Sequence, residues 1–302
     1  MEARMLYVHA LSPIHVGIGQ GAGVIDLPVI REAVTGWPYL PGSGIKGVLR
    51  DACANPGMND GIISEIFGPD TNNASDHAGG AIFTDLRLLC LPVRSYKGGF
   101  AWISSPLALS RWARDCAAAE VTISTDVDPI ADCQIVLTSE TKDKIGTGND
   151  VRLEDLKLTA AVPGGDTVRK IAEKIAAACF PNDQTWQPFF TTHFGIVSDT
   201  TFSFLTRTAT EITARNRIDP ERKIVADGAL WWEEAVPAES IFAGQLIATK
   251  RGSDKLGGAD VLAAEVAKAL EKPVQIGGNA TVGRGLANVR LDLTATTAGV
   301  AP

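Results

Sequence analysis

The glycine-rich loop near the start of the chain is the feature that most restricts its fold. From position 17 to position 23 every second residue is glycine, namely Gly17, Gly19, Gly21 and Gly23. A residue without a Cβ atom can adopt positive φ and lets another chain approach closely. The pattern therefore predicts a loop that contacts a ligand.

An isolated acid follows this loop. Asp26 stands between the apolar pairs Val24-Ile25 and Leu27-Pro28, and the proline prevents this run from being a central strand. An acid in an apolar run is unusual, so Asp26 marks this stretch as a candidate functional site. The alternative is an incidental surface acid beside a glycine-rich turn that caps a core helix.

A helix with two basic residues is predicted after Pro41-Gly42-Ser43-Gly44, with Ser43 as its N-cap. Lys46 and Arg50 lie four residues apart, beside first-turn N–H groups that carry partial positive charge. The start of this helix is therefore predicted to bind phosphate. Its apolar residues recur at i, i+3, i+4 and i+7, the spacing of one buried stripe: Ile45, Val48, Leu49 and Ala52.

Two nucleotide-binding motifs are incomplete in this region. Gly42-x-Gly44-x-x-Gly47 matches the dinucleotide pattern by letter, but it follows prolines instead of a hydrophobic strand. A P-loop would require Ser or Thr after Lys46, where the chain has Gly47. A nucleotide-using metabolic enzyme is therefore only a minor alternative.

The length and composition indicate a globular protein. With 302 residues, 45% of them hydrophobic, the chain can bury a large core as one elaborated domain or two. It lacks the basic and then apolar start of a targeting signal and any run of about 18 apolar residues, so we expect a cytoplasmic protein that binds no membrane. The five cysteines form no C-x-x-C pair and are expected to be reduced core residues.

The net charge of −7 argues against indiscriminate nucleic-acid binding. The local charge differs, because residues 207–223 contain five basic against three acidic residues, which leaves +2. Residues 276–290 contain Arg284 and Arg290 and no acid. A polyanion would have to follow such a path across an otherwise acidic surface.

Strand-like and helix-like segments without a clear βαβ order predict an α+β fold. Helices are expected after Ser105-Pro106, Asp166 and Asp260. Residues 55–80, rich in Asn, Asp, Gly and Ser, are predicted to be a mobile insertion. Residues 212–232 are predicted to form a basic hairpin, in which Trp231-Trp232 are core or interface aromatics rather than a stacking platform. Further strands are expected at 6–12, 81–93, 100–104 and 273–276.

A second glycine-rich loop lies near the end of the chain. It reads Gly277-Gly278-Asn279-Ala280-Thr281-Val282-Gly283-Arg284-Gly285. Successive free N–H groups form an anion-binding nest, and Arg284 adds charge. The alternative is a simple hairpin turn.

With both loops considered, the chain resembles the RAMP superfamily of CRISPR–Cas systems, whose mark is a glycine-rich loop near the C-terminus. It is more specifically similar to the backbone subunits of type III-B (Cmr) effector complexes, and the resemblance spans nearly the whole chain. The stretches that carry this similarity are 13–17, 23–32, 41–50, 228–234 and Ile241-Phe242.

The resemblance implies one elaborated domain over residues 1–302, with an RRM-like (ferredoxin-like) palm, insertions and a protruding β-hairpin thumb. It also implies that copies stack as a helical filament on a crRNA guide, together with other Cmr subunits. Each thumb would displace one guide–target base pair at regular intervals, and guide pairing would read the sequence. The residues expected to bind RNA are Gly17, Ser43, Lys46, Arg50, Arg215, Arg217, Gly277, Gly278, Thr281, Gly283, Arg284 and Gly285.

Asp26 matches the aspartate that this family uses to cleave complementary target RNA, and the resemblance implies a divalent metal such as Mg²⁺. The 2′-OH of RNA is a built-in nucleophile, so Asp26 would either hold the metal or accept the 2′-OH proton. His15 is either an acid–base helper or a structural residue. The alternative function is a catalytically silent RAMP subunit that only coats the guide RNA.

Overall fold

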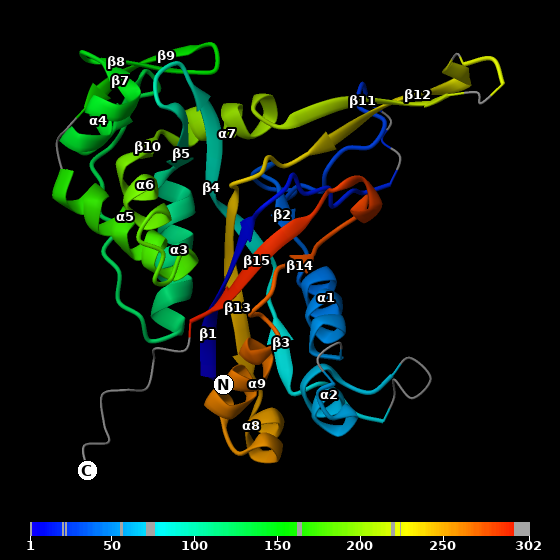
Figure 1. The fold of residues 1–302 in the computed structure, drawn as a ribbon. Coiled ribbons are helices and arrows are strands. Elements are labelled where there is room, and N and C mark those ends of the chain that lie inside the picture. Colours follow the sequence, from blue (N-terminus) through cyan, green and yellow to red (C-terminus); the bar gives the residue numbers. More distant parts are fainter. Residues whose placement is uncertain are drawn as a thin grey trace.

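A mixed β-sheet forms the centre of the computed structural model (Figure 1). Strand β1 (Glu2–Ala10) pairs antiparallel with β13 (Ile241–Ala248) on one side and with β15 (Leu286–Leu291) on the other. The first strand therefore lies between two strands from the end of the chain. The structure describes residues 2–19, 21, 23–54, 57–70, 76–161, 165–218, 221–223 and 225–292.

The sheet continues on both sides of these three strands. β14 (Val274–Gln275) extends it beyond β15, and β4 (Leu86–Ser95) extends it beyond β13. Two short strands, β2 (Tyr39–Leu40) and β3 (Ala81–Phe83), pair with β4 and β13. The order from β4 outward is β5 (Gly99–Ser104), β10 (Phe194–Val197), β6 (Gln134–Val136), β9 (Leu156–Ala161), β8 (Asp150–Leu153) and β7 (Gly146–Thr147).

Helices cover both faces of this sheet, so the predicted α+β class is confirmed (Figure 1). Side chains of β1 alternate between the faces, as a strand requires: Met5 and Tyr7 enter one core, and Leu6 and Val8 enter the other. The first core is covered by α3 (Pro106–Ala118), α5 (Gly165–Cys179) and α6 (Trp186–Thr192). The second is covered by α1 (Gly42–Ala54), α2 (Asp60–Phe67), α8 (Lys250–Leu256) and α9 (Ala259–Lys268). Helix α4 (Ser139–Ile145) follows β6, and α7 (Asp199–Thr208) follows β10.

The start of α3 confirms its prediction. Ser105 Oγ accepts a hydrogen bond from the Ala108 amide, and Pro106 is the first helical residue, where its missing N–H has no cost. Leu109, Trp112 and Cys116 are buried along one side of the helix. The i, i+3, i+4 pattern was therefore sufficient to place this helix.

Three predicted helix caps are wrong. α1 begins at Gly42, so Ser43 lies inside its first turn, and Asp85 Oδ1 accepts the Gly42 amide at 2.8 Å. α5 begins at Gly165 and the N-cap residue of α9 is Gly258, so Asp166 and Asp260 also lie in first turns. In α1, Asp85, which is distant in sequence, accepts the first-turn amide in place of Ser43, the residue that the local pattern predicted as the cap.

Two predictions about exposure are also corrected. Residues 55–80 are not a loop throughout, because α2 buries Ile63, Ile66 and Phe67 against the core; their apolar side chains outweighed the polar composition around them. Cys133 is exposed, whereas the other four cysteines are buried. Burial raises the pKa of the Cys53 thiol to about 11, which keeps it protonated.

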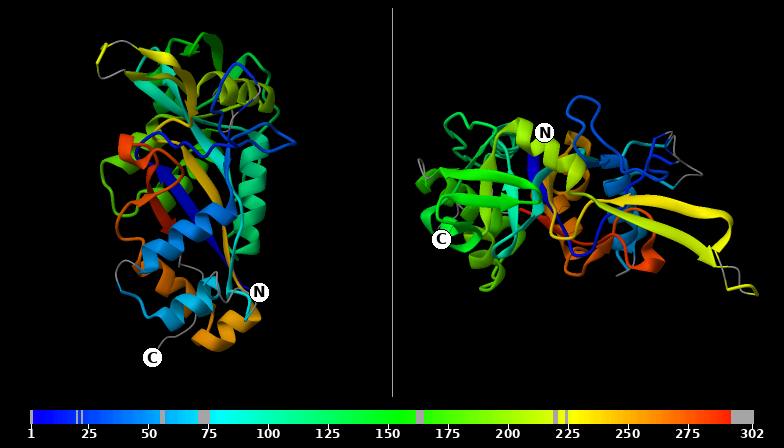
Figure 2. Two further views of the ribbon diagram at one scale, coloured as in Figure 1. Left: turned by 90° about the vertical axis from the view of Figure 1, so that its right-hand side faces the viewer. Right: turned by 90° about the horizontal axis from the view of Figure 1, so that it is seen from above.

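A separate pair of antiparallel strands projects from the sheet (Figures 1 and 2). It consists of β11 (Glu211–Ile218) and β12 (Val225–Ala235) and corresponds to the hairpin expected at 212–232, of which residues 219, 220 and 224 lie outside the described part. Trp232 is 43% exposed on the same face as Ala214 and is therefore not a core residue. No helix in the described ranges is long and apolar enough to cross a membrane.

The close contact between the start of α1 and the end of β3 gives a stability prediction. A Cβ atom at position 42 would lie 2.3 Å from the Phe83 carbonyl oxygen, so Gly42→Ala should lower the free energy of unfolding by about 1–3 kcal/mol in a denaturant titration. Gly44→Ala is the matched control, because nothing lies within 4 Å of its Cβ position and alanine in a helix is favoured by about 0.5–1 kcal/mol. Equal unfolding midpoints for the two variants would contradict this packing.

Candidate functional site

Asp26 lies at the base of the projecting hairpin. Its carboxylate is exposed, and its Oδ2 accepts a hydrogen bond from the Trp232 amide at 2.7 Å. Leu27 donates to the Trp232 carbonyl oxygen and accepts from the Glu234 amide, both at 3.0 Å. The backbone around Asp26 therefore pairs with β12 in the way that a neighbouring strand would. The second carboxylate oxygen of Asp26, Oδ1, has no partner in the described part of the chain.

Glu234 fixes the chain that follows Asp26. Its carboxylate is buried and accepts hydrogen bonds from the Arg31 guanidinium at 2.5 Å, the Val29 amide at 3.0 Å and the Thr210 hydroxyl at 2.9 Å. These hydrogen bonds offset the free-energy cost of burying a charged carboxylate away from water. Glu234 belongs to a stretch that carries the family resemblance, and no local pattern in the sequence predicts this role.

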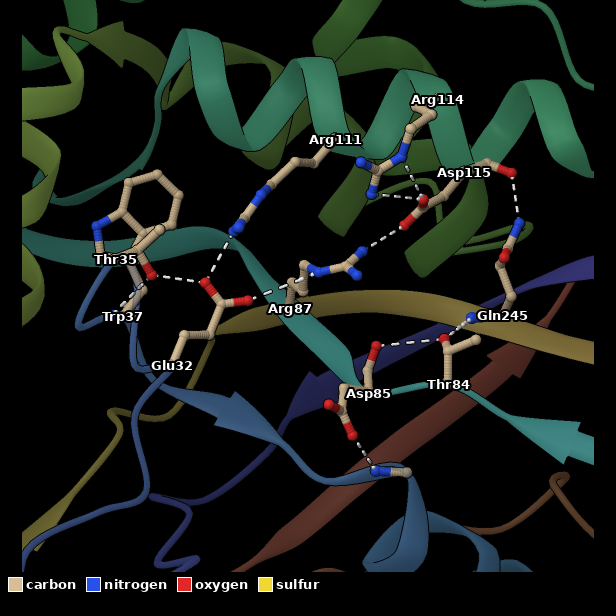
Figure 3. Close-up of polar contacts among 11 residues, drawn as sticks. Glu32, Thr35, Trp37, Thr84, Asp85, Arg87, Arg111, Arg114, Asp115 and Gln245 are labelled. Carbon is tan, nitrogen blue, oxygen red and sulfur yellow. Dashed lines mark hydrogen bonds and ion pairs between the residues drawn. The ribbon is translucent and has the colours of Figure 1, made fainter.

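Glu32 ties the end of the same segment to the body of the protein (Figure 3). Its carboxylate contacts the Arg111 guanidinium of α3 at 2.8 Å and the Arg87 guanidinium of β4 at 3.6 Å. Arg87 in turn pairs with Asp115 at 2.9 Å. The segment that carries Asp26 is thus anchored to β12 by Glu234 and to α3 and β4 by Glu32.

The polar contacts continue from Asp115 to the start of α1 (Figure 3). The Gln245 side chain donates to the Asp115 carbonyl oxygen at 2.7 Å, and the Gln245 amide donates to Thr84 Oγ1 at 2.8 Å. The neighbouring Asp85 accepts the Gly42 amide. The Asp26 segment and helix α1 therefore share one framework.

His15 connects β12 to the C-terminal glycine loop. Its ring is buried, and Nδ1 lies 2.6 Å from the Glu234 carbonyl oxygen, so Nδ1 donates a hydrogen bond to that oxygen. The His15 carbonyl oxygen accepts the Gly278 amide at 2.8 Å. A Cβ atom at position 277 would lie 2.3 Å from that oxygen, and φ is +82° there, so Gly277 is required. These contacts favour the structural alternative for His15.

The C-terminal glycine loop presents backbone rather than side chains. Residues 277–283, which include Thr281 and Gly283, are exposed around a short 3-10 helix at Ala280–Val282. The Gly285 turn has φ +80°, and a Cβ atom there would lie 2.1 Å from the Ile276 carbonyl oxygen. The N–H groups of residues 279–281 make no hydrogen bond within the described ranges, so they can receive an anion.

Helix α1 offers a second open surface. Ser43 is exposed, and nothing lies within 4 Å of the Cβ positions of Gly44 and Gly47. Lys46 is half-buried and has no ion pair with any described residue. Arg50 instead donates to the Gly68 carbonyl oxygen at 2.9 Å and pairs with Asp70 at 2.6 Å. The structure therefore leaves Lys46 available but engages Arg50 within the chain.

The predicted hairpin arginines differ in the same way. Arg217 is exposed and forms no ion pair with the described residues. Arg215 pairs with the buried carboxylate of Glu233 at 3.3 Å. Arg284 contacts the same carboxylate and has only 11% of its side chain exposed.

These elements lie on one side of the molecule (Figures 1 and 2). Figure 1 places the hairpin, the C-terminal glycine loop and α1 away from α5 and α6, whereas the end of the Asp26 segment reaches α3 through the Glu32–Arg111 pair. The structure thus brings together residues that are far apart in the sequence. Gly17 and Gly277, which are 260 positions apart, both lie against His15.

The donor set near Asp26 limits how a metal ion would be held. Within the described ranges, no group of three or more His, Cys, Asp or Glu side chains is arranged to bind a metal. Asp26 Oδ1 is one available carboxylate oxygen. Mg²⁺ is commonly bound by one or two carboxylates together with substrate phosphates, so the residues fit an ion that RNA would help to hold.

A sequence profile described as the RAMP superfamily matches residues 7–288. The chain belongs to the RAMP superfamily. This assignment confirms the resemblance found in the sequence.

One relative of this RAMP protein is named CRISPR system Cmr endoribonuclease Cmr4, from Pyrococcus furiosus. It is 33% identical over 293 residues, which cover 96% of each chain. Another is named CRISPR system Cms endoribonuclease Csm3, from Streptococcus thermophilus, and is 33% identical over 102 residues, or 28% of this chain and 46% of that protein.

Solved structures share the fold of this RAMP protein. Oligomeric Cmr4 from Pyrococcus furiosus superimposes with a TM-score of 0.76 at 27% identity, over 97% of this chain and 98% of that chain. A chain of the type III-B Cmr-beta complex bound to cognate target RNA gives 0.73 over 96% of this chain and 97% of that chain. Its identity is 18%, so this second likeness concerns the fold alone.

The Glu234 contacts generate a test of the site's framework. Glu234→Gln leaves Arg31 without its carboxylate, and breaking a buried pair in this way should lower the free energy of unfolding by about 3 kcal/mol. It should also speed hydrogen exchange at the Leu27 and Val29 amides. The control is Glu154→Gln, whose pair with Arg94 is largely exposed and should be worth less than about 1 kcal/mol. Unchanged exchange at Leu27 would show that Glu234 does not anchor the segment.

Proposed function

We propose that this RAMP protein is the backbone subunit of a type III-B CRISPR effector complex, where it binds crRNA and cleaves complementary target RNA. The observation that carries the proposal is the exposed carboxylate of Asp26, held by β12 at the base of a projecting hairpin. Full-length similarity to a protein named as an endoribonuclease supports it. We place the complex in the cytoplasm.

The guide would lie along α1 and the C-terminal glycine loop. Ser43, Lys46 and the first-turn N–H group of Gly44 would receive phosphates at one point, and the N–H groups of residues 279–281 would receive them at another. Such contacts bind any sequence, because they reach phosphates rather than base edges. Base pairing with the guide would then select the target.

The hairpin β11–β12 would act as the thumb of an RRM-like palm. Copies of the chain, together with other Cmr subunits, would form a helical filament on the guide, and each thumb would displace one guide–target base pair. Cleavage would follow at regular intervals, since every copy brings one Asp26 to the target.

Asp26 can promote cleavage through the nucleophile that RNA supplies. The 2′-oxygen would attack the adjacent phosphorus, the bond from phosphorus to the 5′-oxygen would break, and the departing oxygen would take a proton from water. Asp26 Oδ1 would accept the 2′-OH proton, while the Trp232 amide holds Oδ2 in place. In the alternative role, Asp26 Oδ1 would instead help RNA phosphates to hold a divalent ion, and that ion would supply charge stabilisation.

Removing the charge of Asp26 tests the catalytic role. In the assembled complex, Asp26→Asn should abolish target cleavage while guide binding and assembly are unchanged, because the amide still accepts from Trp232 but cannot take a proton. The control is Asp126→Asn, which changes an exposed acid elsewhere and should cut normally. Cleavage by Asp26→Asn at the wild-type rate would contradict the assignment.

Two further arms of that assay separate the alternatives. A target with 2′-deoxyribose at the cleaved positions should resist cleavage, and the products of normal RNA should end in 2′,3′-cyclic phosphate and 5′-hydroxyl groups. EDTA should stop the reaction if a divalent ion takes part. A wild-type complex that binds target but never cuts it would favour a subunit that only coats the guide.

Salt dependence tests the guide surface on α1. Each phosphate contact to single-stranded nucleic acid contributes about 0.7 to the slope of log K against log salt concentration, so Lys46→Ala should reduce that slope by about 0.7 for guide binding. Lys174→Ala, an exposed lysine of α5 on the other face, should leave it unchanged. Equal slopes for wild type and Lys46→Ala would remove Lys46 from the guide surface.

A further inference from the structure

The side chain of Arg284 is enclosed by the hairpin. Its NH1 group contacts Glu211 at 2.9 Å, its NH2 group donates to Thr213 Oγ1 at 3.2 Å, and its Nε atom lies 3.5 Å from Glu233. Glu211 and Thr213 belong to β11, and Glu233 belongs to β12. One guanidinium at the end of the glycine loop therefore contacts both strands.

The charges around Arg284 leave little attraction for a phosphate. Glu233 is 4% exposed and faces both Arg284 and Arg215, while Glu211 faces Arg284 from the rim with 41% exposed. Two arginines thus meet two carboxylates. An additional anion would have to displace one of these contacts, so Arg284 is poorly suited to the phosphate-binding role that its sequence position predicts.

The glycine loop also reaches the hairpin by a second route. The Gly278 amide binds the His15 carbonyl oxygen, and His15 Nδ1 binds the Glu234 carbonyl oxygen. Asp26 is paired with the same strand through Trp232. The loop, the hairpin and the carboxylate consequently form one connected unit.

We propose that Arg284 is a positioning residue, which joins the glycine loop to the hairpin so that guide bound at the loop fixes the hairpin and Asp26. This inference rests on the proposed function, namely guide binding at the loop and cleavage at Asp26. Its structural part needs only the guide binding, because immobilisation of the hairpin by the guide is measurable without cleavage. The planar guanidinium suits this role, since its fork of donors reaches three side chains at once.

The test compares Arg284→Met with Lys46→Ala in the complex assembled on its guide. Three properties are measured: the salt slope of guide binding, hydrogen exchange of the β11 and β12 amides with and without guide, and the rate and product lengths of target cleavage. For Arg284→Met we expect an unchanged salt slope, loss of the guide-dependent protection of both strands, and cleavage slowed at least tenfold with less uniform product lengths. Lys46→Ala should show the opposite, with a reduced slope and retained protection.

Glu211→Gln serves as a second variant if Arg284→Met folds poorly. It changes a partly exposed residue and removes the negative charge only from the NH1 contact, so it should show the same changes to a smaller extent. A salt slope reduced by Arg284→Met as much as by Lys46→Ala, with hairpin protection intact, would overturn the proposal and make Arg284 a phosphate ligand. If the wild-type complex never cuts RNA, the proposed function fails, whereas the exchange measurement still decides the role of Arg284.

Discussion

The pairing of Leu27 with β12 is the contact on which the whole site depends. Two backbone hydrogen bonds at 3.0 Å, together with the bond from the Trp232 amide to Asp26, turn part of a long connection into an extra strand-like segment. A loop residue fixed in this way has already lost the conformational freedom that it would otherwise lose on binding substrate. The carboxylate is thus oriented by main-chain geometry of the hairpin.

Most arginines around this site neutralise carboxylates of the same chain. Arg31 meets Glu234, Arg50 meets Asp70, and Arg284 meets Glu211 and Glu233. The surface that remains for a polyanion consists largely of glycine backbone and N–H groups. This arrangement reconciles a net charge of −7 with the proposed RNA binding, because local dipoles rather than a global positive field would attract the phosphates.

The polar contacts of Figure 3 give this surface its rigidity. They run from Glu32, at the end of the Asp26 segment, through Arg87 and Asp115 to the residues that hold the first turn of α1. Hydrogen bonds and ion pairs are directional, and partial burial strengthens them, so a connected network of them makes this region rigid. Helix α1, the proposed guide-binding helix, and the carboxylate are therefore both held by the body of the protein.

The sequence by itself determined the features that depend on near neighbours. The buried stripe of α3, its Ser105 cap, the glycines of both loops and the isolated position of Asp26 are visible because helix periodicity and backbone freedom act over a few residues. The tertiary structure alone decided the partners of the charges. Glu234 and Val29 are 205 positions apart and Arg284 and Glu211 are 73 apart, and Asp85 displaced Ser43 from its expected cap. One sequence carries no local signal for such pairs, because they form only when the folded sheet brings distant segments into contact.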